Sequence, residues 1–323
     1  MAASISSEHS RRVRTAVARL SPYSLVVVLA LEFVIFTGLA PETFPTPDTM
    51  GVILSSQAPL LIATLALTLT LIVNEFDLTV GAILVFTDVL VAALAVKYHF
   101  PLVLACVTAV AAGTAVGVVN AFLVVRLGIN SFVATLGMST LLTGLTLAAG
   151  GSTIIADIPQ PLVSFTAGEV LGLPLAVYYA FGVAVILWYV YEYTPVGRYL
   201  YFTGANIDVT RLLGVPTARI KAGAFVASAL IISFAGLMEA GTVGSADPTA
   251  GPTFLLPAFA AAFLGATAIK VGRFNIWGTM IASFLLYTGV TGLALLGLTG
   301  WVQDAFNGVA LLIAIIAARL TSR

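Results

Sequence analysis

The sequence predicts an all-α polytopic membrane protein with about ten transmembrane helices. Of its 323 residues, 60% are hydrophobic and only 9% are charged, and the mean hydropathy is +1.09. Soluble domains carry about a quarter charged residues, so most of this chain is suited to lipid. Most of the apolar runs are long enough to cross about 30 Å of hydrocarbon. Spans are predicted at 23–40, 50–73, 78–96, 101–125, 131–149, 176–193, 220–241, 257–270, 274–297 and 301–318.

Basic residues fix the predicted orientation. When the N-terminus is placed inside and the ten spans alternate, every Lys and Arg except Lys97 falls on the cytoplasmic side, where these residues accumulate in membrane proteins. Both termini are therefore predicted to be cytoplasmic. Residues 1–22 form a cytoplasmic tail, and residues 23–323 form a single transmembrane domain. Five spans in each half permit a 5+5 inverted repeat, as in many transporters.

Several classes of function are excluded by what the sequence lacks. No Gly-Lys pair is present, so the chain has no phosphate-binding P-loop and cannot hydrolyse ATP itself. His9, His99 and the single Cys106 provide neither a nucleophile with its base inside a span nor a metal-ligand spacing. A net charge of +0 offers no broad basic surface to nucleic acid. We expect no enzymatic activity and no metal, cofactor or nucleic acid bound by this chain.

The second span contains a signal for a broken helix. Ser55, Ser56 and Gln57 precede Pro59, and proline removes a backbone donor that lipid cannot replace. Irregular backbone at membrane depth persists only beside protein or water. Gln57 and Pro59 are therefore candidates for lining a transport pathway, and a tolerated kink is the alternative.

A polar turn separates the second and third spans. Asn74, Glu75 and Asp77 stand between two apolar runs without a cationic neighbour in sequence. Inside the membrane, they would have to face partners or a polar cavity and would line or gate a pathway. In an exposed cytoplasmic turn, Asp77 would instead cap the third helix. For Asp77 the sequence favours the cap.

Three other acidic residues, Glu32, Asp88 and Glu239, fall inside or near predicted spans. A proton relay would need such groups. Their spacing shows no ordered chain, so an ion-coupled secondary transporter stays an alternative without a specific motif.

Two long loops are candidate docking surfaces, an external loop at 150–175 and a cytoplasmic loop at 194–219. Within the cytoplasmic loop, a short helix is predicted that Asn206 or Asp208 starts. Gly214 can take the left-handed position that closes such a helix, and Pro216 prevents its continuation.

This short helix carries an apolar ridge, defined as Val209, Leu212 and Leu213, which share one helical face. An apolar ridge on a cytoplasmic loop is suited to a protein partner. A helix lying on the lipid headgroups is the alternative.

Five motifs follow one another from the second span toward the C-terminus. They are Asp77-Leu78-Thr79-Val80-Gly81, Gly117-Val118-Val119-Asn120-Ala121, Phe132 with Thr135-Leu136-Gly137-Met138, Thr194 with Gly197-Arg198, and Gly204 with Asn206, Arg211 and Gly214. In this order, they resemble the permeases of ribose-type ABC sugar importers, inner-membrane components of binding-protein-dependent transport systems in the branched-chain amino acid and ribose permease superfamily. Val209-Thr210 departs from that family's usual pair of alanines, and the segment at 265–274 replaces a more glycine-rich pattern.

The resemblance implies a permease homodimer in the bacterial plasma (inner) membrane. It further implies a cytoplasmic ABC ATPase that binds ATP and Mg, and an extracytoplasmic substrate-binding protein. The residues then expected to couple to the ATPase are Gly197, Arg198, Gly204, Asn206, Asp208, Val209, Arg211, Leu212, Leu213 and Gly214. The residues expected to line the translocation pathway are Gln57, Pro59, Asn74, Glu75, Asp77, Asn120, Asn130 and Phe132.

The function expected from this sequence is import of a small sugar, such as a pentose or related monosaccharide, or of a polyol. Two alternatives stay open. One is the permease of a related ABC importer for branched-chain amino acids or nucleosides, and the other is a secondary ion-coupled transporter.

Overall fold

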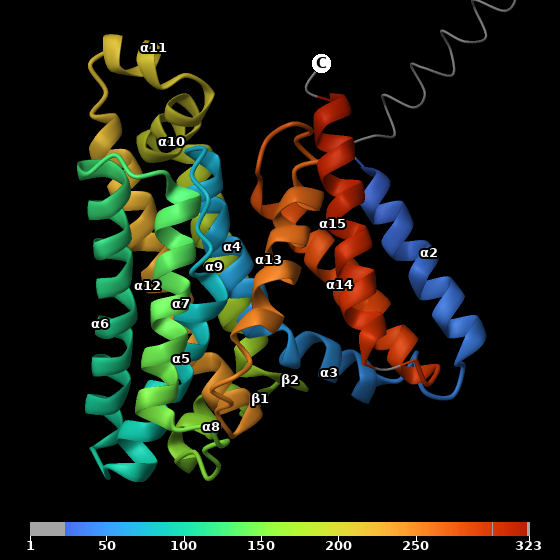
Figure 1. Cartoon of the computed structure of the whole chain (residues 1–323). Coiled ribbons are helices and arrows are strands. Elements are labelled where there is room, and N and C mark those ends of the chain that lie inside the picture. The colour runs from blue at the N-terminus through green and yellow to red at the C-terminus, as the bar shows by residue number, and fades with distance from the viewer. Residues whose placement is uncertain (1–22, 299, 322–323) are drawn as a thin grey trace, which may run out of the picture. The chain divides into compact units, whose positions relative to one another are not determined.

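The computed structural model describes residues 23–298 and 300–321, which are helical over most of their length (Figure 1). The chain forms two compact units. Unit 1 comprises Met1–Phe44 and Ala260–Arg323, and unit 2 comprises Pro45–Phe259. The predicted cytoplasmic tail at 1–22 and the C-terminal Arg323 lie outside the described residues.

Unit 2 contains most of the helices and one small hairpin. In chain order its elements are α3 (Pro47–Ser56), α4 (Ala58–Ile72), α5 (Val80–Ala92), η2 (Ala93–Lys97), α6 (Leu102–Ala121), η3 (Phe122–Arg126), α7 (Ser131–Gly150), α8 (Gln160–Ala167), β1 (Glu169–Val170), β2 (Leu173–Pro174), α9 (Leu175–Tyr193), α10 (Pro195–Ala205), α11 (Ile207–Leu212), α12 (Thr217–Val243) and the first part of α13 (Gly251–Gly265). The segments η2 and η3 are π-helical continuations of α5 and α6.

Unit 1 contains α2 (Ser24–Leu39), the end of α13, α14 (Ile276–Leu295) and α15 (Trp301–Thr321). Helix α14 packs against both α2 and α15. The ring of Phe36 on α2 lies directly against Gly292 of α14, and that ring is 5.4 Å from the ring of Phe44, measured between centroids. Aromatic side chains therefore fill the space that small residues leave on α14.

Helix α12 is the element around which unit 2 is packed, because it contacts α4, α5, α6 and α8. Its contacts depend on glycine residues, which let two helices approach closely. A Cβ atom at Gly117 of α6 would lie 2.8 Å from the carbonyl oxygen of Phe225 on α12. A Cβ atom at Gly236 of α12 would overlap the carbonyl oxygen of Leu84 on α5. Apolar helices gain little from excluding lipid, so close contact at small residues holds them together.

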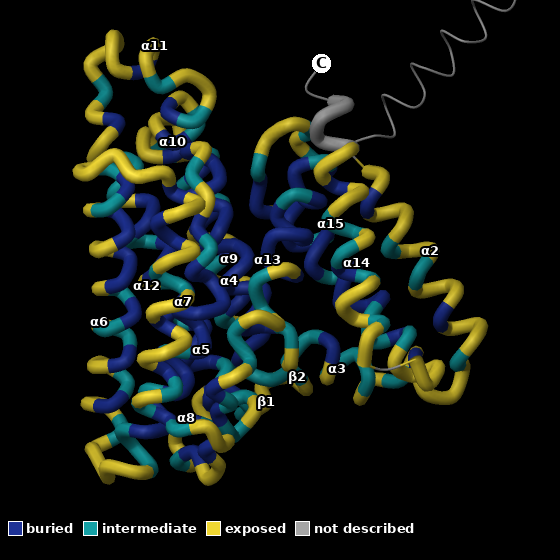
Figure 2. Tube along the Cα trace, in the orientation of Figure 1, coloured by how far each residue is buried: buried dark blue, intermediate teal, exposed yellow. Residues whose placement is uncertain are grey.

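The helices of unit 2 differ in how much of their surface is covered (Figure 2). Every residue of α4 is buried, which explains why this helix is apolar all round. Helices α6 and α7 bury one face and expose another, on which Val103, Val107, Leu136 and Leu141 lie. Such apolar exposed faces are suited to lipid.

Six helices of the described chain are long and apolar enough to cross a membrane, or seven if α3 and α4 count as one span. The axes of α3 and α4 differ by 43°, and Gln57 lies between them, which confirms the break predicted in the second span. Pro59 occupies the first turn of α4, where a missing N–H leaves no bond unmade. Three further apolar helices are shorter, namely α2, α13 and the apolar part of α15.

The eighth predicted span, at 257–270, was placed too far along the chain, because α13 ends at Gly265. Asn275 stabilises the turn that follows. Its Nδ2 donates to the carbonyl oxygens of Gly265 and Ala268, at 3.2 and 3.0 Å. Its Oδ1 accepts from the N–H of Gly278 at 2.8 Å and so caps α14.

The predicted external loop at 150–175 is largely ordered, since it contains α8 and the antiparallel β1–β2 hairpin. The hairpin is the only sheet among the described residues, so the all-α prediction holds apart from these short strands. Leu171 and Gly172 at its tip have φ values of +53° and +78°. Two left-handed residues are what a tight two-residue hairpin turn requires.

Changing Gly236 to Ala is expected to lower the free energy of unfolding by about 1–3 kcal/mol, the usual cost of forcing extra volume into a packed interior. The added methyl would meet the backbone of α5, which has no freedom to move aside. Gly223→Ala is the matched control on the same helix, because a Cβ at Gly223 has no atom within 4 Å. That control should be neutral or stabilise α12 by up to about 1 kcal/mol. Thermal unfolding of the purified variants in detergent compares the two, and equal midpoints would contradict the expectation.

Candidate functional site

The chain between α4 and α5 makes a tight turn, here called the α4–α5 turn and defined as residues 73–79. Asn74 has φ +61°, the left-handed conformation that ends many helices. Its N–H donates to the carbonyl oxygen of Leu71, and the N–H of Glu75 donates to that of Thr70, both at 3.0 Å. This pair of bonds is a Schellman motif with asparagine in place of the usual glycine. The exposed Asn74 therefore has a structural role in ending α4.

Helix α7 binds the backbone of the α4–α5 turn. The N–H of Phe76 donates to Ser131 Oγ at 3.2 Å, and the N–H of Leu78 donates to Thr135 Oγ1 at 3.0 Å. The Thr135 hydroxyl also lies 3.3 Å from the carbonyl oxygen of Phe76. The ring of Phe76 stacks on that of Phe259. Two hydroxyl side chains of α7 thus supply partners that the irregular backbone needs.

Asp77 is almost completely buried, with 1% of its surface exposed. Its Oδ1 accepts hydrogen bonds from the N–H and the hydroxyl of Thr79, and Asn120 Nδ2 on α6 donates to Thr79 Oγ1 at 3.1 Å. Burial raises the pKa of the Asp77 carboxyl, and the two bonds from Thr79 act against that rise. Asp77 Oδ2 and Asn120 Oδ1 have no hydrogen-bond partner among the described residues.

The Asp77 carboxylate accepts from the N–H of Thr79, the residue before α5, as predicted for a side chain at the start of the third helix. The predicted exposure of Asp77 is wrong, because this residue lies inside the protein. The prediction failed because an aspartate just before an apolar helix is usually a solvated cap. Nothing local in the sequence shows that α6 and α7 cover this turn.

Glu75 forms an ion pair with Lys221 of α12. The side chains are 12% and 19% exposed, respectively, so the pair is largely shielded from water. The sequence reveals no cation near Glu75, because its partner lies 146 residues further along the chain.

The helix predicted in the loop at 194–219 is present as α11, and its predicted ends are confirmed. Asn206 Oδ1 accepts from the N–H groups of Asp208 and Val209, at 3.1 and 3.0 Å. Gly214 has φ +80°. The N–H of Gly214 donates to the carbonyl oxygen of Arg211, which closes the helix at a glycine as predicted.

A second helix, α10, precedes α11 and was not predicted. Its start follows Thr194, which accepts from the N–H of Gly197, and Pro195 occupies the first turn. A threonine followed by proline is a known start signal for a helix. Arg198 is exposed on α10, whereas Gly197 is buried against the carbonyl oxygens at the end of α9.

The apolar ridge is exposed as predicted: Val209, Leu212 and Leu213 are 51%, 87% and 71% accessible. Bonds on either side hold it in place. The buried Thr210 hydroxyl lies 2.8 Å from the carbonyl oxygen of Phe202 on α10, and Arg211 Nε donates to Thr217 Oγ1 on α12 at 3.1 Å. Thr210 is thus a link between α10 and α11.

Helix α10 lies directly against the end of α4. A Cβ at Gly204 would overlap the carbonyl oxygen of Ile72, the last residue of α4. The α4–α5 turn begins at the next residue. Through α10, the apolar ridge is therefore mechanically connected to the turn that contains Glu75 and Asp77.

The other predicted pathway residues are not gathered at this turn. Gln57 and Pro59 lie at the opposite end of the 15-residue α4, about 22 Å away along the helix. Asn130 is exposed and caps α7, accepting from the N–H of Phe132 at 3.0 Å. Phe132 is half exposed. Ser131, between these two, accepts from the N–H of Phe76 in the α4–α5 turn.

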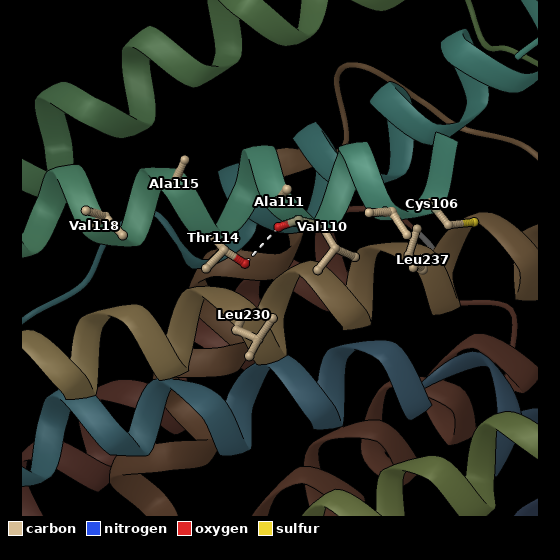
Figure 3. A pocket seen from close by; sticks show the side chains of 9 residues that line it. Cys106, Val110, Ala111, Thr114, Ala115, Val118, Leu230 and Leu237 are labelled. Atoms are coloured by element: carbon tan, nitrogen blue, oxygen red, sulfur yellow. Dashed lines mark hydrogen bonds between the residues drawn. The ribbon is translucent and has the colours of Figure 1, made fainter. Parts of the chain in front are cut away.

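An open groove of about 650 Å³ runs between α6 and α12 (Figure 3). It is lined by Cys106, Val107, Val110, Ala111, Thr114, Ala115, Val118, Leu230 and Leu237. The one hydroxyl in it, on Thr114, donates to the carbonyl oxygen of Val110 at 2.7 Å. This lining offers almost nothing for hydrogen bonding to a polar solute.

A smaller cavity of about 150 Å³ lies between α5, α7 and the start of α13. Three threonines, Thr143, Thr146 and Thr249, are among the residues that line it. Each of their hydroxyl groups donates a hydrogen bond within the protein. The sequence interpretation missed these residues, although Thr143 and Thr146 are spaced to share one face of a helix.

The match to a known protein family covers most of the chain. The sequence model of the family described as "Branched-chain amino acid transport system / permease component" matches residues 49–315. The chain belongs to this family. It is 32% identical to the ribose import permease protein RbsC of Escherichia coli (strain K12) over 91% of this chain and 92% of that protein.

Two further proteins that are similar to this chain are also named as permeases. The D-allose transport system permease protein AlsC of Escherichia coli (strain K12) is 28% identical over 93% of this chain and 92% of its own length. The fructose import permease protein FrcC of Rhizobium meliloti is 30% identical over 84% and 78%, respectively. No solved structure matches the chain.

Changing Thr135 to Val should loosen the α4–α5 turn, because the N–H of Leu78 loses its acceptor. The expected loss is about 1 kcal/mol or more of unfolding free energy. Thr140→Val is the control on the same helix, since the exposed Thr140 hydroxyl bonds only to the carbonyl of its own helix among the described residues. Hydrogen exchange at residues 73–79 should rise in Thr135→Val alone. Equal exchange in both variants would show that α7 does not hold the turn.

Proposed function

We propose that this chain is the transmembrane permease subunit of an ABC importer that carries a small sugar across the bacterial plasma membrane. Family membership supports the transport role. The relatives named for ribose, allose and fructose support a monosaccharide as the substrate. All three are neutral polyhydroxylated molecules, so a polyol belongs to the same chemical class.

The observation that carries the coupling part of this proposal is the exposed ridge on α11. Leu212 has 87% of its surface accessible and sits on a helix held from both sides. A rigid apolar projection in water is typical of a surface that another protein covers. We take that partner to be the cytoplasmic ABC ATPase, with α11 as the coupling helix.

The topology in this proposal has ten spans with both termini cytoplasmic. The bent pair, the other long helices and the three shorter apolar helices correspond in order to the ten predicted spans. In unit 2, η3 ends at Arg126, and the packing of Val124 with Phe225 brings this end beside the start of α12, where Arg219 and Lys221 lie. Lys97 instead donates to the carbonyl oxygen of Gly150 at the end of α7. Basic residues thus gather at the α11 end of this unit, which we assign to the cytoplasm.

The remaining partners follow from the same role. A second copy of the chain completes the permease, and an extracytoplasmic binding protein delivers substrate, with the loop at 150–175 as its contact. ATP and Mg bind to the ATPase, and this chain binds no cofactor itself. Residues 23–323 act as one permease domain, in which the α4–α5 turn and Asn120 line or gate the pathway.

One alternative substrate class has a specific observation in its favour, because the family description names branched-chain amino acids. Uptake assays with ribose, allose, fructose and leucine distinguish the two classes. Uptake of leucine but of none of the sugars would show that the importer carries branched-chain amino acids.

Cysteine labelling tests the orientation. In a Cys106→Ser background, Leu171→Cys at the hairpin tip should react with a membrane-impermeant maleimide on intact spheroplasts. Leu212→Cys should react only after the membrane is permeabilised. Both leucines are highly exposed, at 93% and 87%, so access to the reagent and not burial decides the result. Labelling of Leu212→Cys on intact spheroplasts would place α11 outside the cell and contradict the proposed orientation.

Changing Leu212 to Asp should weaken the ATPase contact by about tenfold or more, because loss of a central apolar anchor costs about 2 kcal/mol. ATP-dependent uptake of the three sugars, with the ATPase and binding protein that serve this chain, is the measurement. Leu298→Asp is the control, since it also places a carboxylate on an exposed leucine, but between α14 and α15. If Leu212→Asp transports as well as Leu298→Asp, α11 is not the coupling helix.

A further inference from the structure

The start of α12 is bonded to both parts of the candidate site. Thr217, its first residue, accepts from Arg211 of α11. Lys221 lies one helical turn further along and forms the ion pair with Glu75 of the α4–α5 turn. A displacement of α11 therefore reaches the α4–α5 turn by a short path through the first turn of α12.

A second path joins α11 to the α4–α5 turn through α10, but this path transmits a push and not a pull. The contact of Gly204 with the Ile72 carbonyl is a packing contact. Packed atoms resist being pushed together, but they do little to draw each other back. An ion pair attracts, so the bond of Glu75 to Lys221 can pull the turn when α12 moves away.

The ion pair also attaches this turn to α12. The backbone of the turn is otherwise bound to α7 through Ser131 and Thr135, and Thr79 is bound to α6 through Asn120. With its two side chains 12% and 19% exposed, the pair is shielded enough to be strong and accessible enough to be hydrated when it opens. The Glu75–Lys221 pair can therefore be either closed or open.

We propose that Glu75 and Lys221 are a positioning pair that makes the α4–α5 turn follow the start of α12, so that movement of α11 by the ATPase changes the pathway beside Asp77 and Asn120. This inference rests on the proposed function. It assigns to Glu75 the role of transmitting motion and not that of binding sugar.

The test uses the complete importer, with its ATPase and binding protein, in proteoliposomes. Sugar uptake and ATP hydrolysis are measured on the same preparation for the wild type, Glu75→Gln, Lys221→Gln and the exchange Glu75→Lys with Lys221→Glu. We expect each single variant to keep ATP hydrolysis but to carry about fivefold less sugar per ATP, the lower end of typical coupling energies. The exchange should restore most of that ratio, because it remakes the pair with reversed charges.

Controls separate the possible failures. Glu42→Gln removes an exposed carboxylate between α2 and α3, outside the surfaces assigned to the partners, and should leave the ratio unchanged. If the wild type shows no ATP-dependent uptake, the proposed function fails before the ion pair is tested. If the wild type transports and the single variants keep its ratio of sugar to ATP, the positioning role is wrong. A fall in uptake and hydrolysis in equal proportion, or no recovery in the exchanged variant, would also overturn it.

Discussion

The close approach of α12 to its neighbours is the constraint on which unit 2 depends. In lipid, no solvent drives apolar helices together, so the backbones must come near enough for direct contact. Gly236 against the Leu84 carbonyl and Gly117 against Phe225 provide this approach. The same helix brings Thr217 to Arg211 of α11 and Lys221 to Glu75 of the α4–α5 turn, so its start joins the two parts of the candidate site.

The same environment explains how the α4–α5 turn survives between two apolar helices. Backbone groups that leave a helix inside a membrane protein need partners from the protein. Asn74 ends α4 by internal bonds, Ser131 and Thr135 serve the backbone that follows, and Thr79 joins Asp77 to Asn120. Thr79 thus links Asp77 to Asn120, and one side-chain oxygen on each of these two residues has no hydrogen-bond partner among the described residues.

The sequence predicted features governed by local chemistry. Asn206 and Gly214 bound a short helix because a capping side chain and a left-handed glycine act on their own neighbours. The break at Gln57 was also predicted from adjacent residues. Features that depend on distant segments could not be predicted from the sequence. The burial of Asp77 requires α6 and α7, and the partner of Glu75 belongs to a helix far along the chain. Helix α10 was missed although Thr194 and Pro195 carry its start signal.

The uncovered leucines of α11 have a consequence for how the protein is made. Leu212 and Leu213 project into water from a helix that cannot fold them away, since Thr210 and Arg211 fix its orientation. Exposed apolar projections favour self-association when nothing covers them. Under the proposed coupling role, a subunit synthesised in excess over its partner would leave this apolar ridge uncovered, and we expect such surplus subunits to self-associate in the membrane.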